Sequence, residues 1–166
     1  MKFPTLFKKP ETQRGKLMKC TLADTPYYSL KDQTKLSKVM SVYDGDSVTI
    51  ATVINNVPTM FRCRLEGVDT PELKPRLGIE NRESHVVMAK RARNRVAQMV
   101  TNCDVDLGSM DTKLDVSSNT KLIEVKCGKF DKYGRLLISI PHHSKTVSDI
   151  LIEEQLGKPY YGGTKL

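Results

Sequence analysis

Tryptophan is absent from this chain, and aromatic residues of all kinds make up only 6% of it. Proteins that hold single-stranded nucleic acid without cleaving it stack bases on aromatic side chains, so this scarcity disfavours a purely stacking binder. The chain also lacks any run of about 18 apolar residues, which argues against a transmembrane helix. Residues 1–16 lack the apolar core of a secretory signal, so we expect an intracellular protein without a membrane partner.

Cysteine and histidine motifs for metal or redox chemistry are missing as well. The four cysteines are Cys20, Cys63, Cys103 and Cys127. None belongs to a CxxC pair, and none has a histidine at metal-ligand spacing. We therefore interpret them as independent thiols, buried as small apolar residues in a reducing compartment. The three histidines show no partner pattern either, and we expect them at the surface.

Charge is plentiful and mostly basic. The chain has 27 Lys and Arg residues against 19 Asp and Glu residues, a formal net charge of +8, which indicates a polyanionic partner such as DNA or RNA. Residues 1–36 carry eight basic and three acidic residues, so most of the excess lies there. We predict a partly disordered basic arm over residues 1–36 and a globular domain over residues 37–166. The pattern leaves open whether residues 20–36 pack on the domain through Tyr27 and Tyr28.

Apolar residues alternate with polar ones over several segments and follow helical spacing over two others. The predicted elements, in chain order, are strands over 37–43, 47–54 and 59–68, a helix over 83–100, strands over 105–107, 121–130 and 135–140, and a helix over 147–156, before an irregular tail. A hairpin turn is expected at Asn55–Asn56, and Arg93 fits the pattern of the first helix poorly. This order predicts an α+β protein, a five-stranded OB-fold β-barrel with two or three helices.

Acidic residues occur at predicted strand ends, where arginines are close in sequence. Asp46 ends the motif "VYDGD", and "VDTPE" places Asp69 and Glu72 after the strand that carries Arg64. Arg135 closes the turn motif "DKYGR". Carboxylate oxygens hold Ca²⁺ or Mg²⁺, a further carboxylate can act as general base, and guanidinium groups stabilise charge on phosphate oxygens. Each motif alone fits an ordinary surface turn, whereas the set together fits phosphodiester hydrolysis.

In their order and spacing, the motifs resemble the staphylococcal (micrococcal) thermonuclease family, whose members are also called SNase-like domains. The resemblance is carried by "VYDGDSVTI", "FRCRLEGVDTPE", "AKRARNRV", "FDKYGRLLISI" and "VSDILIEEQLGKPYYGGTK", and it covers the chain from about residue 37 to residue 165. It implies an OB-fold barrel and a calcium-dependent endonuclease that hydrolyses phosphodiester bonds of DNA, RNA or both. It further implies that water attacks phosphorus, that the 5′-oxygen leaves and that 3′-phosphate ends result.

The resemblance also implies a metal site. Asp46 and Asp69 correspond to the family's calcium-binding carboxylates, and Thr70 corresponds to the residue whose backbone carbonyl completes the protein ligands. Asp44, the other acid of the first motif, is expected to stabilise the turn. Mg²⁺ or another divalent cation is the alternative to Ca²⁺. We expect the protein to act as a monomer on its nucleic-acid substrate.

Three further positions match the family's catalytic residues. Glu72 corresponds to the proposed general base, or water-orienting carboxylate, while Arg64 and Arg135 correspond to the two catalytic arginines. The residues that resemble those holding the terminal phosphate of a bound nucleotide are Lys132, Tyr133 and Tyr161.

Two other functions fit parts of the sequence. Some domains of this family have lost the catalytic residues and bind RNA or proteins, so a catalytically inactive SNase-like module that binds nucleic acid or protein is the alternative. A non-catalytic OB-type binder of single strands is a third hypothesis, which the few aromatic residues weaken. The complete set of five charged positions favours an active enzyme. The connection over residues 104–120 is longer than in the bacterial secreted enzyme and leaves substrate preference open.

Overall fold

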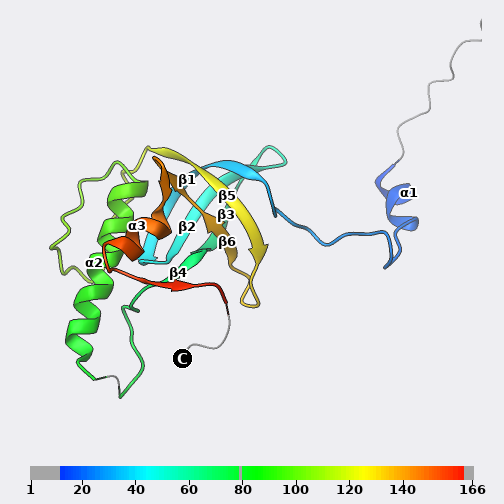
Figure 1. Cartoon of the computed structure of the whole chain (residues 1–166). Helices are drawn as coiled ribbons and strands as arrows, with labels where there is room; N and C mark the ends of the chain where they lie inside the picture. Colours follow the sequence, from blue (N-terminus) through cyan, green and yellow to red (C-terminus); the bar gives the residue numbers. More distant parts are fainter. Residues whose placement is uncertain (1–11, 79, 163–166) are drawn as a thin grey trace, which may run out of the picture.

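The computed structural model describes residues 12–78 and 80–162. Strands β1, β2, β3, β6 and β5 close into a barrel in that order, so the predicted α+β fold with a five-stranded OB-fold-like barrel is confirmed (Figure 1). No helix in these ranges is long and apolar enough to cross a membrane. The elements are α1 (Gln13–Met18), β1 (Thr34–Asp44), β2 (Ser47–Ile54), β3 (Val57–Leu65), β4 (Gly67–Asp69), α2 (Arg82–Val100), β5 (Leu122–Phe130), β6 (Leu136–Ser139), β7 (Pro141–His142), β8 (Lys145–Thr146), α3 (Val147–Glu153) and β9 (Lys158–Tyr160).

The first three barrel strands form the meander that the alternating pattern predicts. Strand β1 pairs with β2, and β2 with β3, in antiparallel register, while β3 pairs with β6 in parallel. The hairpin turn at Asn55–Asn56 is confirmed. Both asparagines have positive φ angles, 50° and 65°, which asparagine adopts more readily than most residues with a side chain.

The barrel interior is filled by the apolar side chains that alternate along the strands. Val39, Ile50, Leu65 and Ile138 are completely or almost completely buried, and burial of each such side chain contributes about 1.5–3 kcal/mol. Helices α2 and α3 lie together on one side of the barrel and add their apolar faces to the same core (Figure 1). The packed core therefore holds the ends of β2 and β3, with their polar residues, in fixed positions.

The strand predicted over residues 105–107 is not formed. Val105 is buried, but the carbonyl groups of this segment bond to side chains of α2 instead of to a neighbouring strand. Gln98 donates to the Val105 carbonyl at 2.8 Å, and the Asn94 amide donates to the carbonyls of residues 106, 107 and 109. Since helix side chains satisfy these acceptors, the segment follows the helix as a loop.

Arg93, which did not fit the predicted helix pattern, is the largest fully buried side chain in the described part of the chain. Its guanidinium donates to the Asn94 side chain at 2.9 Å and to the carbonyls of Asp111 and Thr112 at 3.1 and 3.3 Å. Burial lowers its pKa, and the charges of Asp111 and Asp44 offset only part of that effect. Arg93 thus anchors the long connection onto α2.

The amino-terminal segment, predicted as a partly disordered basic arm, contains one short helix in its described part. Residues 1–11 lie outside the described part, and residues 13–18 form α1, which has no buried residue and lies away from the barrel (Figure 1). Tyr27 and Tyr28 do not pack on the barrel, because 97% and 58% of their surfaces are exposed. Leu30, only 2% exposed, makes the contact instead, and the first strand begins at Thr34.

The carboxyl-terminal part contains two pairings that the sequence did not predict. Strands β7 and β8 form a small hairpin, and β9 pairs with β4, so Tyr160 belongs to a strand instead of an irregular tail. The predicted helix begins at Val147, where Thr146 and Asp149 form a capping box, and it ends at Glu153. The β4–β9 pairing places Lys158 opposite Asp69 and therefore brings the chain end to the predicted site.

The four cysteines are all free, as expected, but only two of them are buried. Cys63 and Cys127 are buried, Cys103 is partly buried and Cys20 is exposed on the amino-terminal segment. Burial raises the pKa of the Cys63 thiol to about 12, which makes it an inert core residue.

Candidate active site

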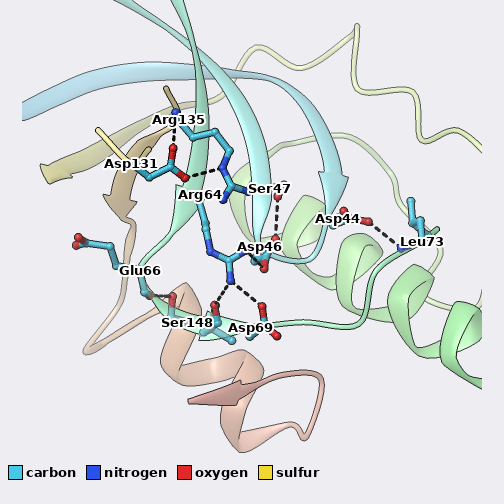
Figure 2. Close-up of polar contacts among 11 residues, drawn as sticks. Asp44, Asp46, Ser47, Arg64, Glu66, Asp69, Leu73, Asp131, Arg135 and Ser148 are labelled. Atoms are coloured by element: carbon cyan, nitrogen blue, oxygen red, sulfur yellow. Dashed lines mark hydrogen bonds and ion pairs between the residues drawn. The ribbon is translucent and has the colours of Figure 1, made fainter. Parts of the chain in front are cut away.

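Three of the predicted site residues meet at one end of the barrel. Asp46 lies in the turn between β1 and β2, Arg64 lies opposite Ser47 near the end of β3, and Asp69 ends β4. Figure 2 shows the Arg64 guanidinium between the two carboxylates. Its Nη1 donates to Asp46 Oδ2, and its Nη2 donates to Asp69 Oδ1 at 2.7 Å. Residues far apart in sequence are thus joined into one cluster, which we call the Arg64 cluster.

The Arg64 cluster is largely shielded from water. The side chains of Asp46, Arg64 and Asp69 are 7%, 13% and 26% exposed, so each charge depends on its partners for compensation. Burial alone would lower the pKa of Arg64, but the nearby Asp46 and Asp69 outweigh it and raise that pKa above its ordinary value. Two carboxylates share one guanidinium, and the cluster therefore keeps a net negative charge in a strongly basic protein.

Gly45 explains why the acidic turn lies so close to the rest of the site. A Cβ atom at this position would lie 2.7 Å from Ala92 Cβ and 2.9 Å from Thr70 Cγ2, closer than such atoms approach in proteins. Glycine is therefore required by the close approach of the turn to α2 and to Thr70. Asp46 and Thr70, two of the predicted metal ligands, are held on either side of this contact.

Thr70 carries an unusual polar atom. Its Oγ1 is the buried side-chain oxygen that has no hydrogen-bond partner within residues 12–78 and 80–162. A buried hydroxyl without a partner is costly, and such groups concentrate at functional sites. This observation separates the turn at Thr70 from an ordinary surface loop.

Asp44 has a structural role, although it differs from the one predicted. Its Oδ1 accepts a hydrogen bond from the Leu73 backbone N–H at 3.0 Å, so it fastens the segment after β4 to the barrel (Figure 2). Burial raises the pKa of Asp44 more than this bond lowers it, and the charges of Asp46 and Glu72 raise it further. Asp44 thus lies close to Glu72 and holds the backbone N–H of Leu73, the residue after Glu72.

Glu72 is exposed and lies three residues beyond Asp69, and its backbone is held by a histidine. The Glu72 N–H donates to His85 Nε2 at 3.3 Å, and His85 is half-buried in the first turn of α2. His85 is thus a partly exposed residue whose ring has a partner that the sequence did not indicate. Sequence spacing gave no signal, because the contact joins positions 13 residues apart across an irregular segment.

Arg135 is held in place by Asp131 in the turn between β5 and β6. Asp131 Oδ1 accepts from the backbone N–H groups of Tyr133 and Arg135 at 2.9 Å each, and Oδ2 accepts from Arg135 Nε at 2.8 Å. Burial alone would raise the pKa of Asp131, but these bonds outweigh it and lower that pKa. Asp131 was not among the predicted site residues, although it opens the "DKYGR" motif.

Arg64 lies in β3, and Arg135 immediately precedes β6, the strand that pairs with β3. Leu137 of β6 pairs with Arg64 of β3, and Arg135 precedes Leu137 by two residues. With strands about 4.8 Å apart and a rise of about 3.3 Å per residue, the two Cα atoms are about 8 Å apart. Figure 2 shows both side chains on this side of the barrel. One phosphate group could contact both.

The predicted phosphate-contacting residues fall into two places. Lys132 Nζ lies 5.1 Å from the centre of the Tyr133 ring, and Arg135 Cζ lies 5.5 Å from it, so the exposed Lys132 and Tyr133 form one group with the partly buried Arg135. Tyr161 is 89% exposed and passes beside Gly67 of β4. Sequence reasoning missed Tyr160, whose ring lies 5.4 Å from the Arg64 guanidinium.

The donors predicted to hold a metal at this end of the barrel are oxygen atoms, and they are few. The described residues contain no group of three or more His, Cys, Asp or Glu side chains placed to hold a metal. The predicted set needs only two carboxylates, Asp46 and Asp69, with the Thr70 carbonyl. Hard oxygen donors and a net negative charge suit Ca²⁺ or Mg²⁺, whose remaining ligands are commonly waters and substrate oxygens.

The fold and this site together define an OB-fold-like α+β protein with a shielded acid–arginine cluster at one end of its barrel. No known protein-family model matches the chain, and no curated protein matches it.

Proposed function

We propose that this protein is a nuclease that depends on a divalent cation, with Ca²⁺ as the expected ion. It hydrolyses phosphodiester bonds of DNA, RNA or both, cuts within strands and leaves 3′-phosphate ends. The observation that supports this proposal best is the Arg64 cluster, in which Asp46 and Asp69 meet a guanidinium in a shielded site. The thermonuclease-like motifs supply the same residues in the same order.

Arg64 and Arg135 would bind the scissile phosphate. A guanidinium has five N–H donors, and Arg64 bonds to Asp46, to Asp69 and to the Val68 carbonyl within the described part of the chain. Two of its N–H groups therefore remain for phosphate oxygens. Guanidinium groups fixed in this way stabilise the charge that develops on those oxygens during hydrolysis.

Glu72 would orient the attacking water and accept its proton. The water oxygen forms a bond to phosphorus, and one water proton passes to the Glu72 carboxylate. The bond from phosphorus to the 5′-oxygen breaks, and the departing 5′-oxygen takes up a proton from solvent and leaves as a hydroxyl group. Lys132, Tyr133 and Tyr161 would contact a neighbouring phosphate and so place the scissile bond. In this account every polar group acts from a position set by the barrel or by the segments packed on it.

Asp46, Asp69 and the Thr70 carbonyl would hold the cation. When bound, a divalent cation supplies polarisation of a phosphate oxygen and neutralises part of its charge. The two carboxylates lie beside the same guanidinium, each bonded to a different nitrogen of Arg64.

The test is cleavage of single- and double-stranded DNA and RNA by the purified protein with Ca²⁺, with Mg²⁺ and with EDTA. We expect degradation that stops in EDTA, and products that carry 3′-phosphate ends. Intact substrate in every reaction, together with a shift of nucleic acid on a native gel, would instead support the inactive binding module. Cleavage that is equally fast in EDTA would contradict the proposed metal site.

A further inference from the structure

Two consecutive backbone N–H groups beside Glu72 are each held by a side chain from another element. The Glu72 N–H donates to His85 Nε2 at 3.3 Å, and the Leu73 N–H donates to Asp44 Oδ1 at 3.0 Å. The described residues between β4 and α2 contain no helix or strand. These two side-chain acceptors therefore take the place of regular secondary structure at Glu72.

The two bonds fix the direction of the Glu72 side chain. The N–H of Glu72 belongs to the peptide plane before its Cα, and the N–H of Leu73 belongs to the plane after it. Because a residue has only two soft backbone dihedrals, restraining both flanking planes restrains both of these dihedrals. The Cα–Cβ bond of Glu72 then points in one direction relative to the barrel and α2.

His85 can act in this way only as a neutral ring. A backbone N–H can donate but not accept, so Nε2 must be the acceptor and the ring proton must lie on Nδ1. The histidine itself is held firmly, because it lies in the first turn of α2 and its own N–H donates to the Asn81 carbonyl at 3.1 Å. A rigid helix thus presents an acceptor to an irregular segment.

We propose that His85 is a positioning residue that orients Glu72 for catalysis. The proposal rests on the nuclease function proposed above, in which Glu72 handles the attacking water. Misplacement of a catalytic group by about 1 Å can reduce a rate by about 100-fold, so loss of one of the two fixed peptide planes should reduce turnover. Substrate affinity should change little, because His85 lies outside the residues proposed to bind phosphate.

The test compares three substitutions of His85. His85→Gln keeps a side-chain acceptor, His85→Ala removes it, and His85→Phe removes it while keeping a ring of similar size. We expect kcat to fall about 10- to 100-fold in the Ala and Phe variants, with KM within about twofold of the original value. The Gln variant should recover most of the kcat. His143→Asn, at an exposed turn position with a φ of 55°, should leave both constants unchanged.

Hydrogen exchange of the Glu72 N–H, followed by NMR, separates this proposal from the proposed function. Exchange should be faster in the Ala and Phe variants and slow again in the Gln variant, whether or not the protein cleaves nucleic acid. An active protein in which the Ala and Phe variants keep the original kcat would overturn the positioning role. So would a fall in kcat without any change in exchange at Glu72. An inactive original protein with the expected exchange pattern would overturn the nuclease proposal, and with it the catalytic purpose of the contact, while leaving His85 as the residue that holds the Glu72 N–H.

Discussion

At the scale of single residues, the site has two features. Its charged side chains are shielded from water and paired with one another, and several backbone N–H groups are each held by a side chain. Arg64 satisfies two carboxylates at once, and the Asp131 carboxylate accepts two hydrogen bonds from Arg135. Gly45 is explained by contact distance, since its φ angle is not in the left-handed region. For each of these residues, contacts with neighbouring atoms explain why that residue type is needed at its position.

Asp44 gives a prediction about pH and stability. Burial is the main reason that its folded-state pKa lies above the ordinary value of 3.8, so ionisation of this carboxyl disfavours the folded state. Its favourable contribution is complete below pH 3.8 and is lost as the pH rises through the folded-state pKa. Asp44→Asn keeps an oxygen for the Leu73 N–H but cannot ionise. We expect the variant to be at least as stable as the original protein at pH 7.

The measurement for Asp44 is urea unfolding of both proteins from pH 3 to pH 7. The difference in unfolding free energy should favour the Asn variant at neutral pH and should shrink toward the acidic end. A variant that is markedly less stable at pH 7 would show that the charge of Asp44, and not its oxygen, holds the Leu73 segment.

At the scale of elements, the sequence predicted the regular part of the fold and missed the parts held by side chains. Strands β1 to β3, β5 and β6 were predictable because inward apolar residues alternate with polar ones. The false strand at Val105 arose because a single buried valine resembles half of an alternating pattern. Strands β7, β8 and β9 have only two or three residues each, too few for any periodic signal.

The candidate site was predictable to a similar degree. Motif spacing placed Asp46, Arg64 and Asp69 at strand ends, and the structure joins them. His85 and Tyr160 could not be found, because their contacts cross an irregular segment and a short strand pair that the sequence does not specify. The catalytic, metal-binding and phosphate-binding roles assigned to all of the predicted site residues stay predictions.

Arg93 supplies a prediction for the long connection over residues 104–120. Arg93→Met should remove the donors to the carbonyls of Asp111 and Thr112, at a cost of about 1–3 kcal/mol in unfolding free energy. Hydrogen exchange should become faster over residues 106–112. The matched control is Arg91→Met, because Arg91 is exposed on the same helix and should tolerate the change. Equal exchange in both variants would mean that the connection does not depend on Arg93.

At the scale of the whole molecule, charge is divided between a basic amino-terminal segment and a barrel with a locally negative site. Residues 1–36 hold most of the +8 net charge, whereas the Arg64 cluster is net negative. Such a division would let the segment attract nucleic acid in general while the barrel performs the reaction.

Deletion of residues 1–19 tests this division of roles. The described part of that segment, including α1, has no buried residue, so the unfolding free energy should change by less than about 0.5 kcal/mol. Affinity for DNA should fall, and the slope of log affinity against log salt should shrink by about 0.9 for each phosphate that the shortened protein no longer neutralises. Fluorescence anisotropy of a labelled duplex measures both. An unchanged slope would show that the segment does not contact nucleic acid.

The most direct test of the central claim is the cleavage rate of Arg64→Lys beside Arg95→Lys. Both arginines bond to carboxylates, but Arg95 pairs with Glu154 away from the Arg64 cluster. Lysine keeps the positive charge and loses the planar fork. We predict that Arg64→Lys lowers the rate about 100- to 1,000-fold at unchanged DNA affinity, while Arg95→Lys cleaves normally. Equal rates in the two variants would contradict the assignment of this cluster as the catalytic centre.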